Sequence, residues 1–139
     1  MKYKICCDGG ARGNPGPAAT GYVIRDQDCN ILEAGGSFLG TATNNIAEYK
    51  AVVEALAKLK ESGAGKGDEV EISVDSQLVA RQLNGLYKVK NSAIRDLVVQ
   101  VRGQESNFSK VAYIQIERSK NVEADRVVNQ ILDQGKYGN

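Results

Sequence analysis

Residues 5–16 constrain the fold most, because a β-patterned run there ends in an aspartate and passes directly into a glycine-rich turn. Apolar and polar residues alternate with a period of two, which predicts a first strand that ends at Asp8. Gly9 and Gly10 have no Cβ, so the backbone after this strand can approach a partner closely. Residues 19–24 also have a strand pattern, so the turn is predicted to open a β-hairpin rather than a helix.

The rest of the chain predicts a single domain, residues 1–139, in which about residues 135–139 form a flexible tail. The further predicted strands are residues 21–26, 31–39, 70–74 and 111–116. Four helices are predicted. The first is capped within residues 43–45 and ends at about Glu61, the next two span residues 77–83 and 93–104, and the last is capped by Asn121. This order fits a meander followed by right-handed crossovers. We therefore expect an α/β fold with a five-stranded mixed sheet flanked by helices, in which strands one to three are antiparallel and strands four and five run parallel to strand one.

Composition limits the chemistry. The 139 residues include no histidine and three cysteines, and the net charge is +1. Ser-His-Asp and Cys-His nucleophile chemistry and His-ligated zinc are excluded, so an enzyme of this sequence would depend on carboxylates.

The cysteines lack Cys-x-x-Cys spacing, and we expect them to be reduced thiols that lie mostly in the core. We also expect a cytoplasmic monomer without a leader or a membrane span. Any contact with a polyanion needs a local patch, for which the basic residues between Arg81 and Arg102 are the candidate.

Four acidic residues lie where strands end or helices begin. Asp8 and Asp75 each terminate a predicted strand. Glu48 lies on the apolar stripe of its helix, and Asp125 shares a face with apolar residues near the start of the last helix. Three of them also have a structural alternative. Glu48 could be the capping-box partner of Asn45, and Asp75 could be a helix N-cap. Asp125 could simply complement a helix dipole.

The predicted topology brings these four acids together. Asp8 and Asp75 would be neighbours at the carboxyl ends of parallel strands, the edge at which open α/β sheets bind ligands. Glu48 and Asp125, on the first turns of the covering helices, would lean over the same edge. Clustered carboxylates repel one another unless cations are present, and oxygen ligands without histidine favour Mg²⁺ or Mn²⁺. The sequence therefore predicts a divalent-metal site.

Four segments resemble type 1 ribonuclease H, in its compact form without the basic protrusion. They are residues 8–16, 43–48, 75–77 and 121–125, which follow the family order nearly end to end with all four acidic positions occupied. The resemblance implies a ribonuclease H-like fold and a metal-dependent endonuclease that hydrolyses the RNA strand of an RNA/DNA hybrid, leaving 5′-phosphate and 3′-hydroxyl ends. It implies two Mg²⁺ ions, with Mn²⁺ as a substitute, and catalytic and metal-binding roles for Asp8, Glu48, Asp75 and Asp125.

The resemblance also implies where the hybrid binds. Amide side chains would read the RNA strand through its minor groove and 2′-hydroxyls, Thr43 would hold a phosphate of the DNA strand, and Tyr87 in its basic connector would stack on deoxyribose. A core or half-buried position is the alternative for Tyr87. The implied substrate contacts are Gly9, Gly10, Asn14, Thr43, Asn44, Asn45, Ser76, Gln77, Tyr87, Lys88, Lys90, Arg118 and Asn121.

The chain departs from better-known family members in three places. Many members carry a histidine in the loop before the last aspartate, where this chain has Arg118, Ser119 and Lys120. The basic protrusion is missing, and Thr41 replaces an arginine, so we expect modest affinity for the hybrid. A catalytically weak RNase H-like module that binds hybrid or double-stranded RNA is the alternative function. Cleavage of double-stranded RNA as a side activity stays open.

Overall fold

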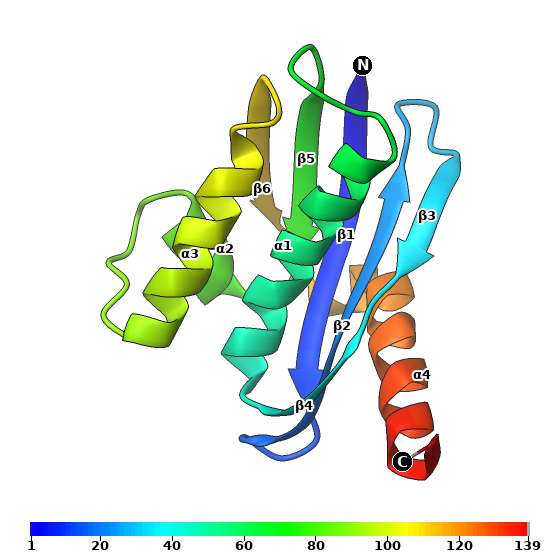
Figure 1. Ribbon diagram of the computed structural model, residues 1–139, viewed down its shortest axis with the longest axis vertical. Helices are drawn as coiled ribbons and strands as arrows, with labels where there is room; N and C mark the ends of the chain where they lie inside the picture. Colours follow the sequence, from blue (N-terminus) through cyan, green and yellow to red (C-terminus); the bar gives the residue numbers. More distant parts are fainter. Residues whose placement is uncertain (139) are drawn as a thin grey trace.

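A six-stranded mixed sheet forms the centre of the molecule. The computed structural model describes the backbone of residues 1–138 and the side chains of residues 1–135. The strands are β1 (Lys2–Ala11), β2 (Gly16–Arg25), β3 (Ile31–Gly35), β4 (Phe38–Ala42), β5 (Glu69–Val74) and β6 (Lys110–Gln115). Their order is β3-β2-β1-β5-β6, and β4 also pairs with β2 (Figure 1). The hairpin pairs are antiparallel and β1, β5 and β6 are parallel, which confirms the predicted mixed sheet.

Helices cover both faces of this sheet. They are α1 (Asn44–Glu61), α2 (Gln77–Leu83), α3 (Ser92–Glu105) and α4 (Val122–Gly138), with a 3₁₀ helix, η1 (Arg118–Lys120), before α4. α1 packs on β1 and β2 with α3 beside it, and α4 packs on β2 and β1 (Figure 1). Tyr22 of β2 belongs to the larger core with α1, whereas Ala19 packs on Val128 and Leu132 of α4. Since Tyr22 and Ala19 are three residues apart on one strand, α1 and α4 lie on opposite faces.

The register between β1 and β5 places two of the predicted acids side by side. Cys6 pairs with Ser73 in the parallel ladder, so Asp8 and Asp75 follow at the same level, two residues further along each strand. The prediction that β1 ends at Asp8 is wrong. The strand continues to Ala11, because the residues beyond Asp8 remain paired with β2. Asp8 therefore lies inside a strand, with residues paired to β2 both before and after it.

The prediction of one strand over residues 31–39 is wrong. The chain forms β3 and β4 there and breaks at Gly36, where a Cβ would lie 2.1 Å from the carbonyl oxygen of Thr20. The N–H of Ser37 then donates to the Thr20 hydroxyl at 2.8 Å. This close approach to β2 bends the chain, so the sheet has six strands rather than the predicted five.

The last helix extends further than the sequence predicts. α4 continues to Gly138, so the predicted tail from residue 135 lies within a helix up to that point, and Asn139 lies outside the described residues.

The cysteines are free thiols. Cys7 is buried as expected, but Cys29 is exposed and is therefore not a core thiol. Among the described helices, none combines the length and the apolar character needed to cross a membrane.

Candidate active site

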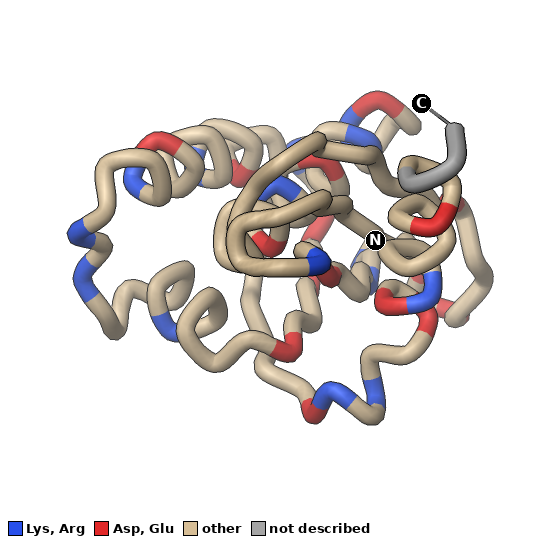
Figure 2. Tube along the Cα trace, turned by 90° about the horizontal axis from the view of Figure 1, so that it is seen from below, with Lys and Arg blue, Asp and Glu red and all other residues tan. Residues whose placement is uncertain are grey.

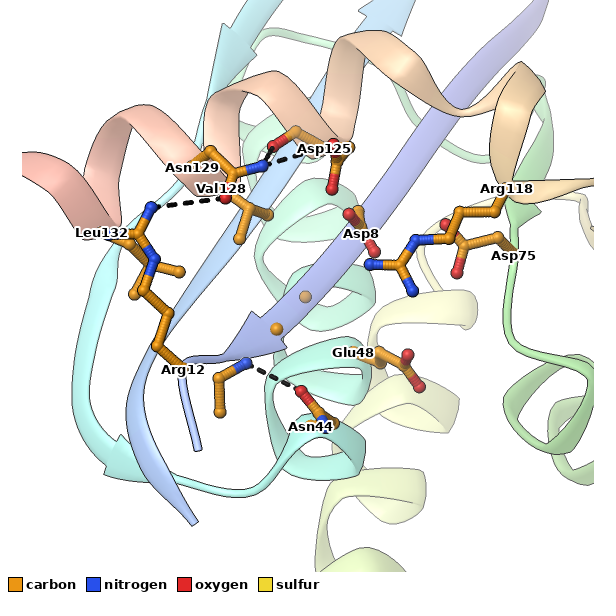
Figure 3. A pocket seen from close by; sticks show the side chains of 13 residues that line it. Asp8, Arg12, Asn44, Glu48, Asp75, Arg118, Asp125, Val128, Asn129 and Leu132 are labelled. Carbon is orange, nitrogen blue, oxygen red and sulfur yellow. Dashed lines mark hydrogen bonds between the residues drawn. The ribbon is translucent and has the colours of Figure 1, made fainter. Parts of the chain in front are cut away.

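Three of the predicted acids meet at the carboxyl ends of β1 and β5. Asp8 lies in β1, Asp75 directly follows β5, and Glu48 projects from the start of α1 (Figure 3). One carboxylate oxygen of each lies within 4.8 Å of those of the other two. These residues line a pocket of about 330 Å³, here called the acidic pocket, to which Asp125 and Arg118 also contribute. The fold thus brings all four predicted acids to one place.

Glu48 reaches this group because β1 and α1 touch at Gly9. A Cβ on Gly9 would lie 2.2 Å from the carbonyl carbon of Ala47 and 2.4 Å from the backbone nitrogen of Glu48. No side chain can occupy such a space, so only glycine permits this contact. The glycine after Asp8 therefore sets the separation between the strand that carries Asp8 and the helix that carries Glu48.

Asp125 reaches the acidic pocket from the opposite face of the sheet. α4 crosses β2 at Gly21, where a Cβ would lie 2.5 Å from the carbonyl oxygen of Ala124. Gly21 pairs with Asp8 across the hairpin, so the contact that lets α4 approach the sheet also places Asp125 beside Asp8. The Asp125 carboxylate points toward Asp8 (Figure 3), although it is not one of the three mutually closest acids.

The capping alternatives for two of the acids are wrong. α1 is capped by Thr43, whose hydroxyl accepts a first-turn N–H at 3.2 Å, so Glu48 is not part of a capping box. α2 is capped by Ser76, whose hydroxyl also accepts a first-turn N–H at 3.2 Å, so Asp75 is not the N-cap. Asp125 does lie in the first turn of α4, where it complements the helix dipole in addition to lining the pocket.

Burial and mutual repulsion make two of these carboxyl groups hard to ionise. Loss of hydration, followed by the negative charge of Asp75 and then of the other acids, raises the pKa of Asp8 to about 7. Burial likewise raises the pKa of Glu48 to about 7, and the neighbouring Ser76 hydroxyl and then the Arg118 guanidinium only partly oppose this. A bound cation would remove the repulsion and favour the ionised forms.

The donor set of the acidic pocket fits a hard divalent cation. Glu48 Oε2 is buried and has no hydrogen-bond partner among the described residues, although buried oxygens in proteins are normally satisfied. The pocket offers carboxylate oxygens and no imidazole, which is the ligand chemistry of Mg²⁺ and Mn²⁺. Asp8, Glu48 and Asp75 are close enough together for one ion to contact all three.

Two residues from the loop before α4 complete the site. The Arg118 guanidinium points into the acidic pocket toward Asp8 (Figure 3). Asn121 donates from Nδ2 to the carbonyl oxygen of Cys7 at 2.8 Å and to Asp75 Oδ2 at 3.1 Å. Asn121 is only 1% exposed, which contradicts a direct substrate contact, and its Oδ1 accepts no hydrogen bond from a described residue, which contradicts a capping role for its side chain. It fixes Asp75 instead.

Several predicted nucleic-acid contacts line a track that begins at the acidic pocket. Asn44 lines both this pocket and a second groove of about 440 Å³. Asn45 lines both the second groove and a third of about 290 Å³. The predicted contacts in the second groove are Asn14, Thr43, Asn44 and Asn45, and those in the third are Asn45, Lys88 and Lys90.

Asn14 and Asn44 join the glycine-rich turn to the start of α1. The N–H of Asn44 donates to Asn14 Oδ1 at 3.0 Å, and the N–H of Ala11 donates to Asn44 Oδ1 at 2.8 Å. Each side chain thus uses its carbonyl oxygen within the protein. Neither amide nitrogen forms a hydrogen bond with another described residue, so both remain free to donate to a ligand.

The connector between α2 and α3 carries the remaining predicted contacts. Its basic positions lie at the outer edge of the molecule in the end-on view (Figure 2). Tyr87 is 45% exposed, which excludes a core position but agrees with the half-buried alternative. The Arg81 guanidinium lies 5.4 Å from the centre of the Tyr87 ring and donates to its hydroxyl. Gln77 is exposed at the start of α2, outside the linings of the three grooves.

Sequence reasoning missed three residues around these grooves. Asn91 caps α3 by accepting the N–H of Ile94 at 3.1 Å, and it lines both the second and the third groove. Arg12 and Asn129 line the acidic pocket. An asparagine before an apolar helical pattern signals a cap, but nothing local to these residues indicates which surface they border.

Comparison with known proteins agrees with this geometry. The profile of the family described as reverse transcriptase-like matches residues 6–131. The bifunctional protein Rv2228c of Mycobacterium tuberculosis is 38% identical over 134 residues, which cover 96% of this chain and 36% of that protein. Ribonuclease HI of Halobacterium salinarum is 39% identical over 126 residues, which cover 91% of this chain and 62% of that protein. The chain therefore spans less than two thirds of the length of these relatives.

Solved structures show the same similarity in three dimensions. The N-terminal RNase H domain of Rv2228c superposes with a TM-score of 0.90 at 37% identity, covering 96% of this chain and all of that one. LC11-RNase H1, solved in complex with an RNA/DNA hybrid, gives a TM-score of 0.90 at 38% identity and covers 96% of this chain and 98% of that one. The chain therefore belongs to the reverse transcriptase-like family, within which it is a ribonuclease H domain of type 1, as its four sequence segments predicted.

Proposed function

We propose that this protein is a metal-dependent endoribonuclease that hydrolyses the RNA strand of RNA/DNA hybrids. The observation that carries the proposal is the acidic pocket, in which Asp8, Glu48 and Asp75 lie within 4.8 Å of one another at one end of the nucleic-acid track. A protein that only bound nucleic acid would gain nothing from unneutralised carboxylates facing a polyanion. The hybrid bound by LC11-RNase H1 supports the choice of substrate.

Each acid would have a role in holding metal. Asp8, Glu48 and Asp75 would together hold a pair of Mg²⁺ ions, with Mn²⁺ as a substitute. Asp125 would contribute a further carboxylate, on the side of the attacking water. When bound, the two ions supply activation of that water and stabilisation of the leaving 3′ oxygen, giving 5′-phosphate and 3′-hydroxyl ends.

The neighbouring residues would orient the nucleic acid. The free amide groups of Asn14 and Asn44 face the second groove, where donors can reach the base edges and 2′-hydroxyls that distinguish RNA from DNA. Thr43 would hold a phosphate of the DNA strand, and the connector with Lys88 and Lys90 would attract the backbone further along. Arg118, at a position where many family members carry histidine, would place a cation in the pocket that receives the reacting phosphate.

A gel assay tests this proposal directly. Labelled RNA/DNA hybrid, double-stranded RNA and DNA duplex are incubated with Mg²⁺, Mn²⁺ or EDTA, using wild type and Asp8→Asn. We expect the hybrid to be cut only with a divalent metal and only by wild type. Binding without cutting would favour the alternative, a catalytically weak binding module. Cutting of double-stranded RNA would reveal the side activity that the sequence leaves open.

Two further properties belong to the proposal. The free thiols suit a reducing compartment, so we place the protein in the cytoplasm. We also propose that it acts as a monomer, because one chain supplies all four acids of the acidic pocket. Light scattering during size-exclusion chromatography measures this directly.

A further inference from the structure

Asp125 is held differently from the other three acids. Asp8 lies within β1, Asp75 directly follows β5 and accepts a hydrogen bond from the buried Asn121, and Glu48 is fixed by the contact of α1 with β1 at Gly9. Asp125 instead projects from the side of α4, and its main chain alone does not determine where the carboxylate points. A side chain in this position occupies several rotamers unless a neighbour selects one.

Asn129 is the neighbour that selects the rotamer of Asp125. It lies one turn further along α4, so the two side chains share a helix face. Its Nδ2 donates to the carbonyl oxygen of Asp125 at 3.1 Å and to Asp125 Oδ2 at 3.3 Å. The amide thus occupies one carboxylate oxygen, and the Asp125 carboxylate remains turned toward Asp8 (Figure 3).

Arg12 orients Asn129 from a distant segment of the chain. Its Nη2 donates to Asn129 Oδ1 at 3.5 Å and forms an ion pair with Asp133 Oδ1 at 2.7 Å. This contact settles which end of the Asn129 amide faces Asp125, because the oxygen is taken by Arg12 and only the nitrogen is left to donate. Arg12 belongs to the glycine-rich turn that also carries Asn14, which is bonded to the start of α1.

We propose that Asn129, oriented by Arg12, is a positioning residue that fixes Asp125 for metal binding and couples the metal site to the turn that contacts the substrate. This inference rests on the proposed function for its catalytic meaning. Without the Asn129 amide, the Asp125 carboxylate would have to be ordered when an ion binds, which lowers metal affinity. Groups that orient metal ligands in this way typically contribute about 10-fold or more to affinity or activity.

The test compares Asn129→Ala, Arg12→Ala and the double variant with Gln130→Ala. Gln130 is an exposed neighbour on α4 whose side chain makes no hydrogen bond with any other described residue. Mn²⁺ binding is measured without substrate by the electron paramagnetic resonance signal of free Mn²⁺. Cleavage of the hybrid is then followed against Mg²⁺ concentration, with kcat and KM determined separately and folding checked by Tm.

We expect Asn129→Ala to weaken Mn²⁺ binding at the site to which Asp125 contributes about 10-fold and to raise the Mg²⁺ requirement, with KM for the hybrid unchanged. Arg12→Ala should have a smaller effect in the same direction, and the double variant should match Asn129→Ala, because Arg12 acts through Asn129. The inference would be overturned if both single variants bound Mn²⁺ as tightly as Gln130→Ala does. It would also be overturned if the loss of affinity in the double variant equalled the sum of the losses in the two single variants. A wild type that binds Mn²⁺ but does not cleave would refute the proposed function alone.

Discussion

β5 is flanked by two aspartates with opposite surroundings. At its amino end, the Asp68 carboxylate accepts hydrogen bonds from the N–H of Gly65 at 2.8 Å and from the amino group of Met1 at 3.1 Å, and these partners lower the pKa of Asp68. At its carboxyl end, Asp75 faces Asp8 and Glu48, two acids whose pKa values burial raises to about 7. The same strand is therefore preceded by an acid whose charge is neutralised and followed by an acid that shares a pocket with further acids. The difference shows that the partners of a carboxylate, rather than its position next to a strand, decide whether it has a structural role or a catalytic one.

The largest expected effect comes from exchanging each of these aspartates for its amide. Asp75→Asn should slow hybrid cleavage by about 10³-fold or more, because it removes a metal ligand and each 1.36 kcal/mol of lost transition-state stabilisation is tenfold in rate. Asp68→Asn should leave kcat unchanged and lower Tm slightly, since it loses only an ion pair and a backbone bond. Equal losses of activity in both variants would show that the two ends do not differ in function.

A smaller effect is expected from filling the close contact at Gly9. Gly9→Ala places a methyl group 2.2 to 2.4 Å from the backbone of Ala47 and Glu48. The helix must move away from the strand, and we expect a loss of about 3 kcal/mol in the free energy of unfolding, measured in urea. Gly65→Ala, at the other end of the sheet, is the matched control, because its Cβ would meet nothing within 4 Å. A mild effect of Gly9→Ala would contradict the close packing of β1 on α1.

The pH dependence of stability should separate the two ends as well. The folded-state pKa values of Asp8 and Glu48, about 7, lie above the unfolded values near 4. The folded protein therefore binds more protons between about pH 4 and 7, so without metal its stability should fall as pH rises through that window. We expect a change on the order of 2 kcal/mol, since partial hydration reduces the full effect. Asp68 has a lowered pKa, so its contribution should disappear only below about pH 4.

Urea unfolding at several pH values in EDTA measures this slope, and Asp8→Asn should flatten it. Mg²⁺ should stabilise the protein more at pH 8 than at pH 6, because the ion binds the deprotonated carboxylates. A metal-free protein whose stability rises from pH 5 to pH 7 would contradict the raised pKa values of both acids.

The smallest effect is expected for the exposed ion pair at the neutralised end. Lys2 Nζ lies 3.9 Å from Glu71 Oε1, and both side chains are partly exposed. Lys2→Ala should change the free energy of unfolding by less than about 0.5 kcal/mol and leave cleavage unaffected. A larger loss would mean that the charges at this end matter more than their exposure suggests.

Sequence alone predicted the order of the elements and the meeting of the four acids, because both follow from periodicity and from the handedness of crossovers. It did not predict the break at Gly36, which depends on how closely that residue approaches Thr20 across the sheet. It also assigned Asn121 to a cap, although its side chain is buried against Cys7 and Asp75. Local patterns identify residues with capping or ligand chemistry, whereas the tertiary fold decides which of them touch.

The pairing of β1 with β5 links the formation of the acidic pocket to correct folding. A slip of one residue in that ladder would place Cys7 or Gly9 beside Asp75 instead of Asp8, and it would also turn Ile5 and Cys7 away from the buried core. The same register therefore specifies both the packing of the core and the meeting of Asp8 with Asp75. A fully folded preparation should then contain one competent metal site for every chain, and titration with metal would count them.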